Sequence, residues 1–144
     1  LVFVFRSSTV TVERKEVDVK MLQKLGHAID SVHPDMGVIY VTGPMFFAAA
    51  ESLRESFAEH TDDRVVILSM RGVPLIDLSG LEVIEELWKR QRAHGGELML
   101  AAVQPAVREV FDRARLTAEI GERNFFWSAD RAILAANEQL MAGA

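Results

Sequence analysis

Residues 65–81 read VVILSMRGVPLIDLSGL, and this stretch decides the fold. It begins with Val65 to Ser69, an apolar and largely β-branched run that is typical of a buried strand. Pro74 then breaks any regular structure. From Ser79 to His94 the apolar residues recur at helical spacing, at Leu81, Ile84, Leu87 and Trp88. A buried strand, a connection and an amphipathic helix together predict one unit of an α/β sheet.

The same alternation continues on both sides of this stretch. Upstream, Gly37 to Val41 reads as a buried strand and Ala48 to Glu59 as a helix. Downstream, strands and helices alternate again, with strands at Glu97 to Val103 and Phe125 to Trp127, a helix that begins at Pro105, and a last helix from Ala129 to Met141 capped by Ser128. Strands that alternate with helices in this way predict parallel strands joined by right-handed crossovers.

The N-terminal part of the chain follows a different pattern. Alternating valines between Ser7 and Lys20 predict one or two strands, with a hairpin around Arg14 and Lys15. Residues 21–32 have the spacing of an amphipathic helix that ends near Pro34. These strands add antiparallel partners, so the expected fold class is α/β, with a mixed β-sheet and flanking helices.

The first five residues, Leu1 to Phe5, are all apolar and allow two interpretations. They are β-branched or aromatic enough for a strand, and they also fit the stub of a membrane helix whose remainder is missing. Because the chain begins with Leu1 rather than Met, we expect it to be processed or cut from a longer protein.

Composition restricts the function further. The chain has 144 residues, 49% of them hydrophobic, and a formal net charge of -5, as in one soluble globular domain. The acidic balance argues against nucleic acid as a partner. Because the sequence has 0 cysteines, disulfides, thiolate metal sites and thiol nucleophiles are excluded. No apolar run reaches the roughly 20 residues of a spanning helix, and no signal peptide is recognisable.

No pattern typical of catalysis or cofactor binding occurs. Phosphate-binding loops and a nucleophile elbow are absent from the sequence, and Gly95-Gly96 follows a helix as a C-cap. The histidines are dispersed, which predicts neither a metal nor any other cofactor: His27, His33, His60 and His94. The carboxylates Glu82, Glu85 and Glu86 read as a solvated helix face with the pairs Glu85–Lys89 and Glu86–Arg90. We therefore expect no enzymatic activity.

One group of residues stands out, at Asp77, Leu78, Ser79 and Gly80. Ser79 and Glu82 match a capping box. In this motif the Ser79 side chain accepts from the Glu82 amide, and the Glu82 side chain accepts from the Ser79 amide. Ser79 also occupies a helix N-terminus, where the helix dipole favours an added phosphate. Because this group follows a strand, at the edge where open α/β sheets bind other molecules, it is the expected contact or ligand edge.

At this point the chain resembles the STAS domain, the module shared by sulfate transporters and anti-sigma-factor antagonists. The resemblance runs from about Gly37 to Ala136. It rests on Val73 to Leu81, on the run Gly95 to Ala101, and on Pro105 to Arg108. It implies the STAS fold, which is the fold of the anti-sigma-factor antagonists.

A second segment, Thr42 to Glu51, is similar to the G-P-x-F-F-x-A-A-E pattern of the SulP anion transporters. This resemblance implies a regulatory and interaction domain on the cytoplasmic face of the inner or plasma membrane. It implies docking on the transmembrane domain of the same transporter, a cytosolic protein or small ligand as a further partner, and oligomers through the parent protein. Residues 1–36 are then a strand and helix extension or a linker from the membrane region, and residues 37–144 the STAS domain.

The alternative is a soluble anti-sigma-factor antagonist. That branch carries D-S-S-G with a phosphorylated second serine, with which Ser79 aligns, so the alternative predicts a phosphorylation switch at Ser79. Leu78 stands where the first serine of the pattern is expected, which is a departure from it. A small α/β enzyme is the third hypothesis, for which the sequence offers no cluster of titratable groups.

Overall fold

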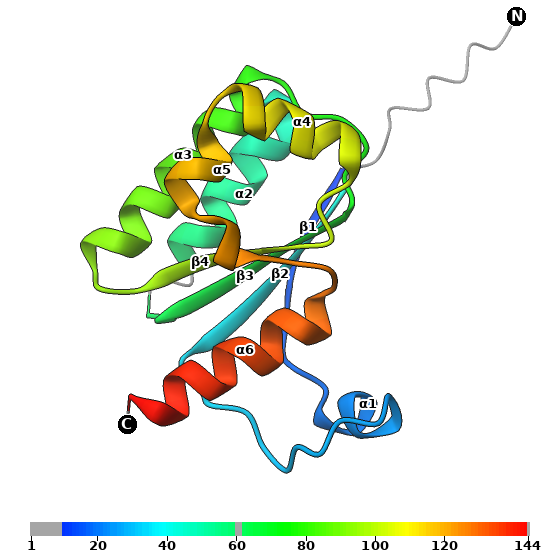
Figure 1. Cartoon of the computed structure of the whole chain (residues 1–144). Helices are drawn as coiled ribbons and strands as arrows, with labels where there is room; N and C mark the ends of the chain where they lie inside the picture. Colours follow the sequence, from blue (N-terminus) through cyan, green and yellow to red (C-terminus); the bar gives the residue numbers. More distant parts are fainter. Residues whose placement is uncertain (1–9, 60–61, 144) are drawn as a thin grey trace, which may run out of the picture.

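The computed structural model describes residues 10–59 and 62–143. Five strands form one sheet in the order β1-β2-β3-β4-β5. The strands are β1 (Thr11–Lys15), β2 (Met36–Thr42), β3 (Val65–Gly72), β4 (Glu97–Ala101) and β5 (Phe125–Phe126). Strand β1 is antiparallel to β2, and all later neighbours are parallel. The predicted mixed sheet with flanking helices is confirmed (Figure 1).

Helices cover the two faces of this sheet unequally (Figure 1). One face carries α2 (Phe47–Glu59), α3 (Leu78–Ala93), α4 (Pro105–Arg113) and α5 (Leu116–Ile120). The other face carries α6 (Ala129–Ala142) and the short α1 (Val19–Lys24). A 3-10 turn, η1 (Glu122–Asn124), precedes β5.

Alternation along the strands builds a separate core on each face. In β2, Ile39 packs with the helices of the larger layer, whereas Val38 packs towards α6. The same division places Phe125 in the larger core and Phe126 against the smaller one, as strand geometry requires. Phe125 and Phe126 therefore face opposite sides of the sheet.

The N-terminal part differs from the sequence-based expectation in two ways. No hairpin forms at Arg14 and Lys15, because both lie inside β1 and pair with β2. The predicted helix over residues 21–32 is much shorter, since Gly26 adopts a φ of 92° that only glycine tolerates well and so ends α1. The chain after Gly26 still buries Ile29 in the smaller core. Leu1 to Phe5 lie outside the described residues.

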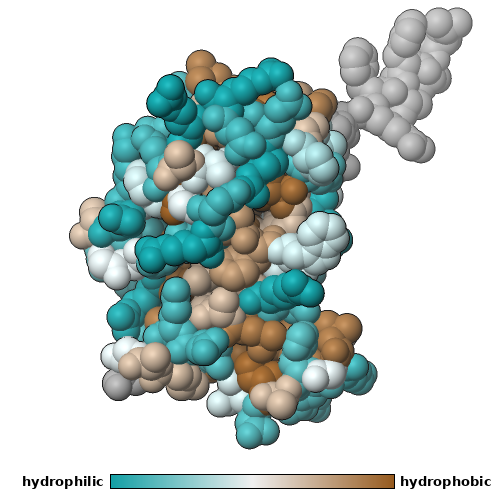
Figure 2. All heavy atoms as spheres, viewed as in Figure 1, coloured by the Kyte–Doolittle hydropathy of each residue, from teal (hydrophilic) through white to brown (hydrophobic). Residues whose placement is uncertain are grey.

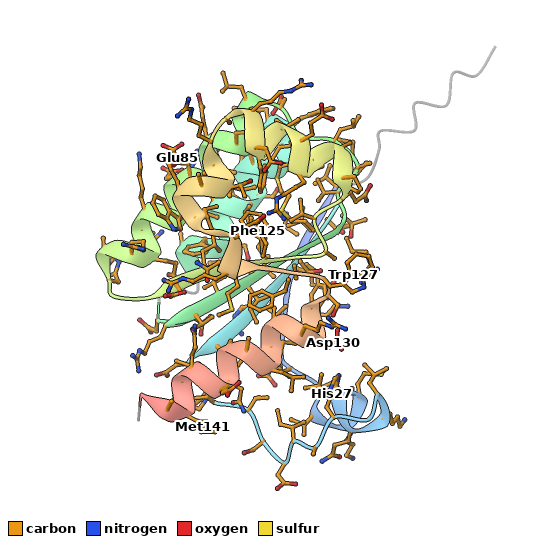
Figure 3. All side chains as sticks on the ribbon, viewed as in Figure 1. His27, Glu85, Phe125, Trp127, Asp130 and Met141 are labelled. Carbon is orange, nitrogen blue, oxygen red and sulfur yellow. The ribbon has the colours of Figure 1, made fainter. Side chains whose placement is uncertain are left out.

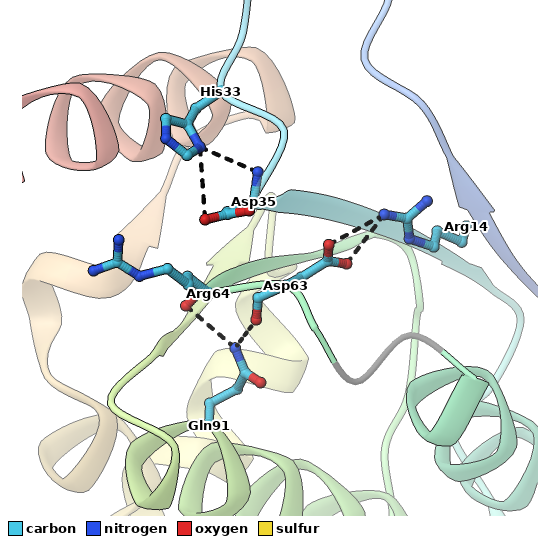
Figure 4. A network of polar contacts seen from close by, with 6 residues as sticks. All are labelled: Arg14, His33, Asp35, Asp63, Arg64 and Gln91. Carbon is cyan, nitrogen blue, oxygen red and sulfur yellow. Dashed lines mark hydrogen bonds and ion pairs between the residues drawn. The ribbon is translucent and has the colours of Figure 1, made fainter. Parts of the chain in front are cut away.

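A polar network lies at the end of the sheet where β3 and β4 begin (Figure 4). Arg14 of β1 forms an ion pair with Asp63 at 3.1 Å. The buried side chain of Gln91 on α3 donates to the carbonyl oxygens of Asp63 and Glu97, each at 3.1 Å. These contacts supply partners to backbone acceptors where the chain enters β3 and β4.

Candidate functional site

The group at Asp77 to Gly80 lies where β3 passes into α3, beside the start of α2. Met45 and Ile76 form an isolated parallel bridge there. The amide of Met45 donates to the Leu75 carbonyl at 2.9 Å, and the amide of Asp77 donates to the Met45 carbonyl at 3.3 Å. The connections after β2 and after β3 are therefore joined into one surface at the carboxyl edge of the sheet.

The cap of α3 is Asp77, and the predicted Ser79–Glu82 capping box is wrong. The helix begins at Leu78, and the Asp77 Oδ1 accepts from the amide of Gly80 at 3.1 Å. Ser79 is the second residue inside the helix, two positions after the N-cap, so its hydroxyl does not occupy the capping position. Aspartate is as good a cap as serine. The Ser-x-x-Glu pattern favours Ser79 over Asp77 in the sequence-based prediction.

Gly80 allows the start of α3 to pack closely against the connection that contains Met45. A Cβ atom at Gly80 would lie 2.5 Å from the carbonyl oxygen of Met45 and 2.6 Å from the Ile76 side chain. Such distances leave no room for any other residue without movement of the backbone. Gly80 is buried, whereas Asp77 and Leu78 are exposed and Ser79 is partly exposed.

Four large apolar side chains are exposed around this junction: Phe46, Phe47, Leu75 and Leu78. We call them the carboxyl-edge patch. Phe47 and Leu78 are 68% and 69% exposed, although each is the first residue of a helix. Large apolar side chains exposed together on two joined connections are typical of interaction surfaces. The local sequence predicts a contact edge at Leu78, but no local pattern joins Leu78 to Phe46 and Phe47, because the sheet brings two separate connections together.

Strand β1 starts at the same edge. Because β1 is antiparallel to β2, its first residue Thr11 pairs with Thr42 at the carboxyl end of β2. The chain therefore enters the domain at the edge that carries the carboxyl-edge patch. Among the described residues, no helix is both long and apolar enough to cross a membrane.

The other candidate residues serve structural roles. Glu85 pairs with Lys89 at 2.8 Å, as predicted. Glu86 does not pair with Arg90; it accepts from Arg54 of α2 at 2.8 Å and so ties α2 to α3. Gly95 adopts a φ of 74° and ends α3, which confirms the predicted glycine C-cap.

Within the described ranges, no three of the side chains that ligate metals converge. His27 instead lies 3.0 Å from Asp130 on α6, and His33 lies beside Asp35. His94 lies next to the carbonyl of Arg90 at the end of α3, and His60 lies outside the described residues. Figure 3 shows His27 and Asp130 facing each other across the gap between α1 and α6.

Comparison with known proteins agrees with this geometry. The STAS domain family model matches residues 28–132. The "Putative sulfate transporter YvdB" of Bacillus subtilis (strain 168) is 30% identical over 95 residues, which is 65% of this chain and 18% of that protein. The high affinity sulfate transporter 1 of Stylosanthes hamata is 29% identical over 113 residues, 69% of this chain and 17% of that protein. The chain thus spans under a fifth of the length of these relatives.

Solved structures of related proteins have the same fold. A sulfate transporter family protein from Wolinella succinogenes superposes with a TM-score of 0.70 at 26% identity, covering 80% of this chain and 93% of that chain. The STAS domain of a SulP transporter from Vibrio cholerae gives a TM-score of 0.70 at 24% identity, covering 87% and 99%.

The fold is shared more widely. An anti-sigma factor antagonist structure from Thermotoga maritima gives a TM-score of 0.64 at 16% identity over 73% of this chain and 90% of that chain, a likeness of fold alone. The family match, covering most of the chain, and the homology to SulP sulfate transporters show that this chain belongs to the STAS domain family.

Proposed function

We propose that this chain is the non-catalytic cytoplasmic regulatory and interaction domain of a SulP-type secondary transporter of sulfate or a related anion. The homology to sulfate transporters supports this proposal, and so does the small share of those relatives that the chain spans. In such a protein the anion is selected among membrane helices, and this domain supports their assembly and receives a cytosolic signal. Oligomers then form through the parent protein.

The carboxyl-edge patch is the observation that carries the proposal. Its four apolar side chains lie at the edge where the chain enters β1, so a membrane region that precedes the domain would meet this edge first. Burying each such side chain in a contact contributes about 1.5–3 kcal/mol. We therefore assign the docking contact with the transmembrane domain of the same transporter to Phe46, Phe47, Leu75 and Leu78.

The test uses the intact gene from which the chain derives, expressed in cells that lack their own sulfate uptake. We expect the double variant Phe47→Asp, Leu78→Asp to lower anion uptake by at least about tenfold through loss of docking, since two buried contacts are removed. The matched control is Met21→Asp, Met141→Asp, which charges two exposed apolar side chains, 52% and 48% exposed, that belong to the helices on the other face of the sheet. Equal uptake by wild type, patch variant and control would overturn the assignment.

The second candidate is a soluble anti-sigma-factor antagonist switched by phosphorylation of Ser79. Its supporting observation is the place of Ser79 in the first turn of a 16-residue helix, where the helix dipole stabilises a phosphate. It predicts a short gene without membrane helices and a kinase partner that is released when Ser79 is phosphorylated. An open reading frame that encodes spanning helices upstream of Leu1, with no phosphate at Ser79, would reject this candidate in favour of the transporter.

A further inference from the structure

A groove of about 620 Å³ lies at the carboxyl ends of β3, β4 and β5, and none of its lining residues belongs to the carboxyl-edge patch. Arg71 borders it from the end of β3, and Val103 and Pro105 from the connection between β4 and α4. Phe126 and Trp127 close it on the side of β5. Its size is in the range of sites for small molecules, and most of its lining side chains are apolar.

The topology explains why a groove opens here. The connection after β4 leads to α4 on one face of the sheet, whereas the connection after β5 leads to α6 on the other face (Figure 1). Neighbouring parallel strands whose connections diverge leave a crevice between them. Ligands of open α/β sheets bind in crevices of this kind.

The walls of the groove are held in place by specific contacts. Ala102 adopts a φ of 55°, a left-handed conformation that is uncommon for a residue other than glycine, and its amide donates to the Phe126 carbonyl at 2.9 Å. The Gln104 side chain donates to the carbonyl of Arg71 at 2.6 Å. Backbone strain that is retained by such contacts is found mainly at functional sites.

The two arginines of the groove differ in their partners. Arg108 lies over the Phe125 ring at 4.0 Å and pairs with Glu122 and Asp112, so its charge is already compensated. Arg71 is exposed and forms no ion pair with any other residue in the described ranges. The guanidinium of Arg71 is therefore the cation of this groove that a ligand can use.

An exposed aromatic ring completes the arrangement. Trp127 is 81% exposed, and Figure 3 shows it at the outer edge of the molecule, while Phe125 lies inside beneath the helices. Figure 2 shows apolar side chains gathered near the middle of this face, bordered by polar ones. An uncompensated cation beside a solvent-exposed indole suits a ligand with one charged end and one apolar body.

We propose that this groove binds a small organic anion, whose carboxylate, sulfonate or phosphate contacts Arg71 and whose apolar body packs on Phe126 and Trp127. This site is separate from the docking contact of the proposed function and does not depend on it. Phe126 of β5 and the adjacent Trp127 contact the ligand in this proposal. Ser128, the next residue, caps α6, so ligand binding also restrains the start of α6.

The test follows the nitrogen-15 NMR spectrum of the 144-residue chain during titration with 1-naphthalenesulfonate. The chain has two tryptophans, and a Trp127→Phe variant assigns their indole N–H signals. We expect the Trp127 signal and the Arg71 side-chain signal to shift saturably while that of Trp88 on α3 stays constant. Methanesulfonate, which lacks the ring, and 1-naphthalenemethanol, which lacks the charge, should each bind about tenfold more weakly.

Variants separate this site from non-specific binding. Arg71→Gln should weaken 1-naphthalenesulfonate about tenfold, as expected for loss of one charge-assisted contact. The control Arg113→Gln removes an arginine from α4 whose side chain is 77% exposed, and it should leave binding unchanged. The proposal is overturned by the absence of a saturable shift at Trp127, by equal binding to Arg71→Gln, or by equal binding of either truncated probe.

Discussion

At the scale of single residues, the junction between β3 and α3 depends on two residues that have different tasks. Asp77 caps the helix through the amide of Gly80, and Gly80 lets α3 approach the Met45 backbone. Ser79, between them, makes no side-chain hydrogen bond to another described residue that stabilises the turn. The stability of the junction should therefore be sensitive to Asp77 and Gly80 and insensitive to Ser79.

The first prediction compares Asp77 with Ser79. Asp77→Ala should lower the free energy of unfolding by about 1 kcal/mol, because the Gly80 amide loses its acceptor. Ser79→Ala should change it by less than about 0.5 kcal/mol, since alanine favours helix and no cap is lost. Urea denaturation measures both values. A larger loss for Ser79→Ala than for Asp77→Ala would restore the capping box and contradict the structure.

The second prediction concerns Gly80→Ala. Alanine normally stabilises a helix relative to glycine, yet here its methyl group would meet the Met45 carbonyl oxygen at 2.5 Å. We expect a net loss of about 1–3 kcal/mol, as found for overpacked sites. Thermal unfolding of Gly80→Ala and of the control Ser79→Ala measures the difference. A Gly80→Ala protein as stable as wild type would show that α3 can move away from Met45 at little cost.

At the scale of elements, long periodic segments were predictable and short ones were not. The helices from Pro105 and from Ala129 repeat their apolar positions over several turns, so the period identifies them. The segment over residues 21–32 has the same period by coincidence: Leu22 is buried from α1 and Ile29 from the following loop, while Leu25 is 59% exposed. Only tertiary packing distinguishes the two cases.

The candidate site shows the same division. The local sequence placed Asp77 to Gly80 correctly at the start of a helix after a strand. The cap was assigned wrongly because two good cap residues lie two positions apart, and spacing cannot choose between them. The groove at Arg71 and Trp127 was not predictable, because its residues come from three strands whose order in the sheet no local pattern reveals.

The contact between α1 and α6 gives a third prediction, on pH. Hydrogen bonds from Ser128 and His27 hold the pKa of Asp130 below its usual range. A lowered carboxyl pKa stabilises the folded state above the unfolded pKa of about 4, and this contribution is lost as the pH falls through the folded value. Asp130→Asn should therefore lower the free energy of unfolding by about 0.5 kcal/mol at pH 7, as is typical of partly exposed pairs, and by less as the pH falls towards 3.

Urea denaturation from pH 3 to pH 7 measures that difference. The matched control is Glu138→Gln, which neutralises an exposed carboxylate farther along α6. Its effect should be small and nearly constant over the range. A loss in the free energy of unfolding of Asp130→Asn that grew towards pH 3 would contradict this prediction. It would mean that the ionised carboxylate destabilises the folded chain, against the geometry of the His27 contact.

At the scale of the whole molecule, the N-terminal residues are integrated with the sheet. Strand β1 covers the edge of β2 with five residue pairs, and Arg14 of β1 bonds Asp63, which lies just before β3. Helix α1 and the loop after it bury Leu22 and Ile29 against the smaller core. The division into an extension, residues 1–36, and a domain, residues 37–144, stays a prediction, and removal of the extension tests it.

We expect a chain that begins at residue 37 to be less stable than the full chain by at least about 4.5 kcal/mol, because three buried apolar side chains, Leu22, Ile29 and Met36, lose their contribution of about 1.5–3 kcal/mol each. Without β1, the edge of β2 presents unpaired backbone groups and invites pairing between copies. Denaturation and sedimentation of the fragments 10–144 and 37–144 measure both effects. The first keeps β1 and α1 and serves as the reference for the second. Equal stability of the second as a monomer would instead show that β1 and α1 are accessory, as expected for a linker that only connects the domain to a membrane region.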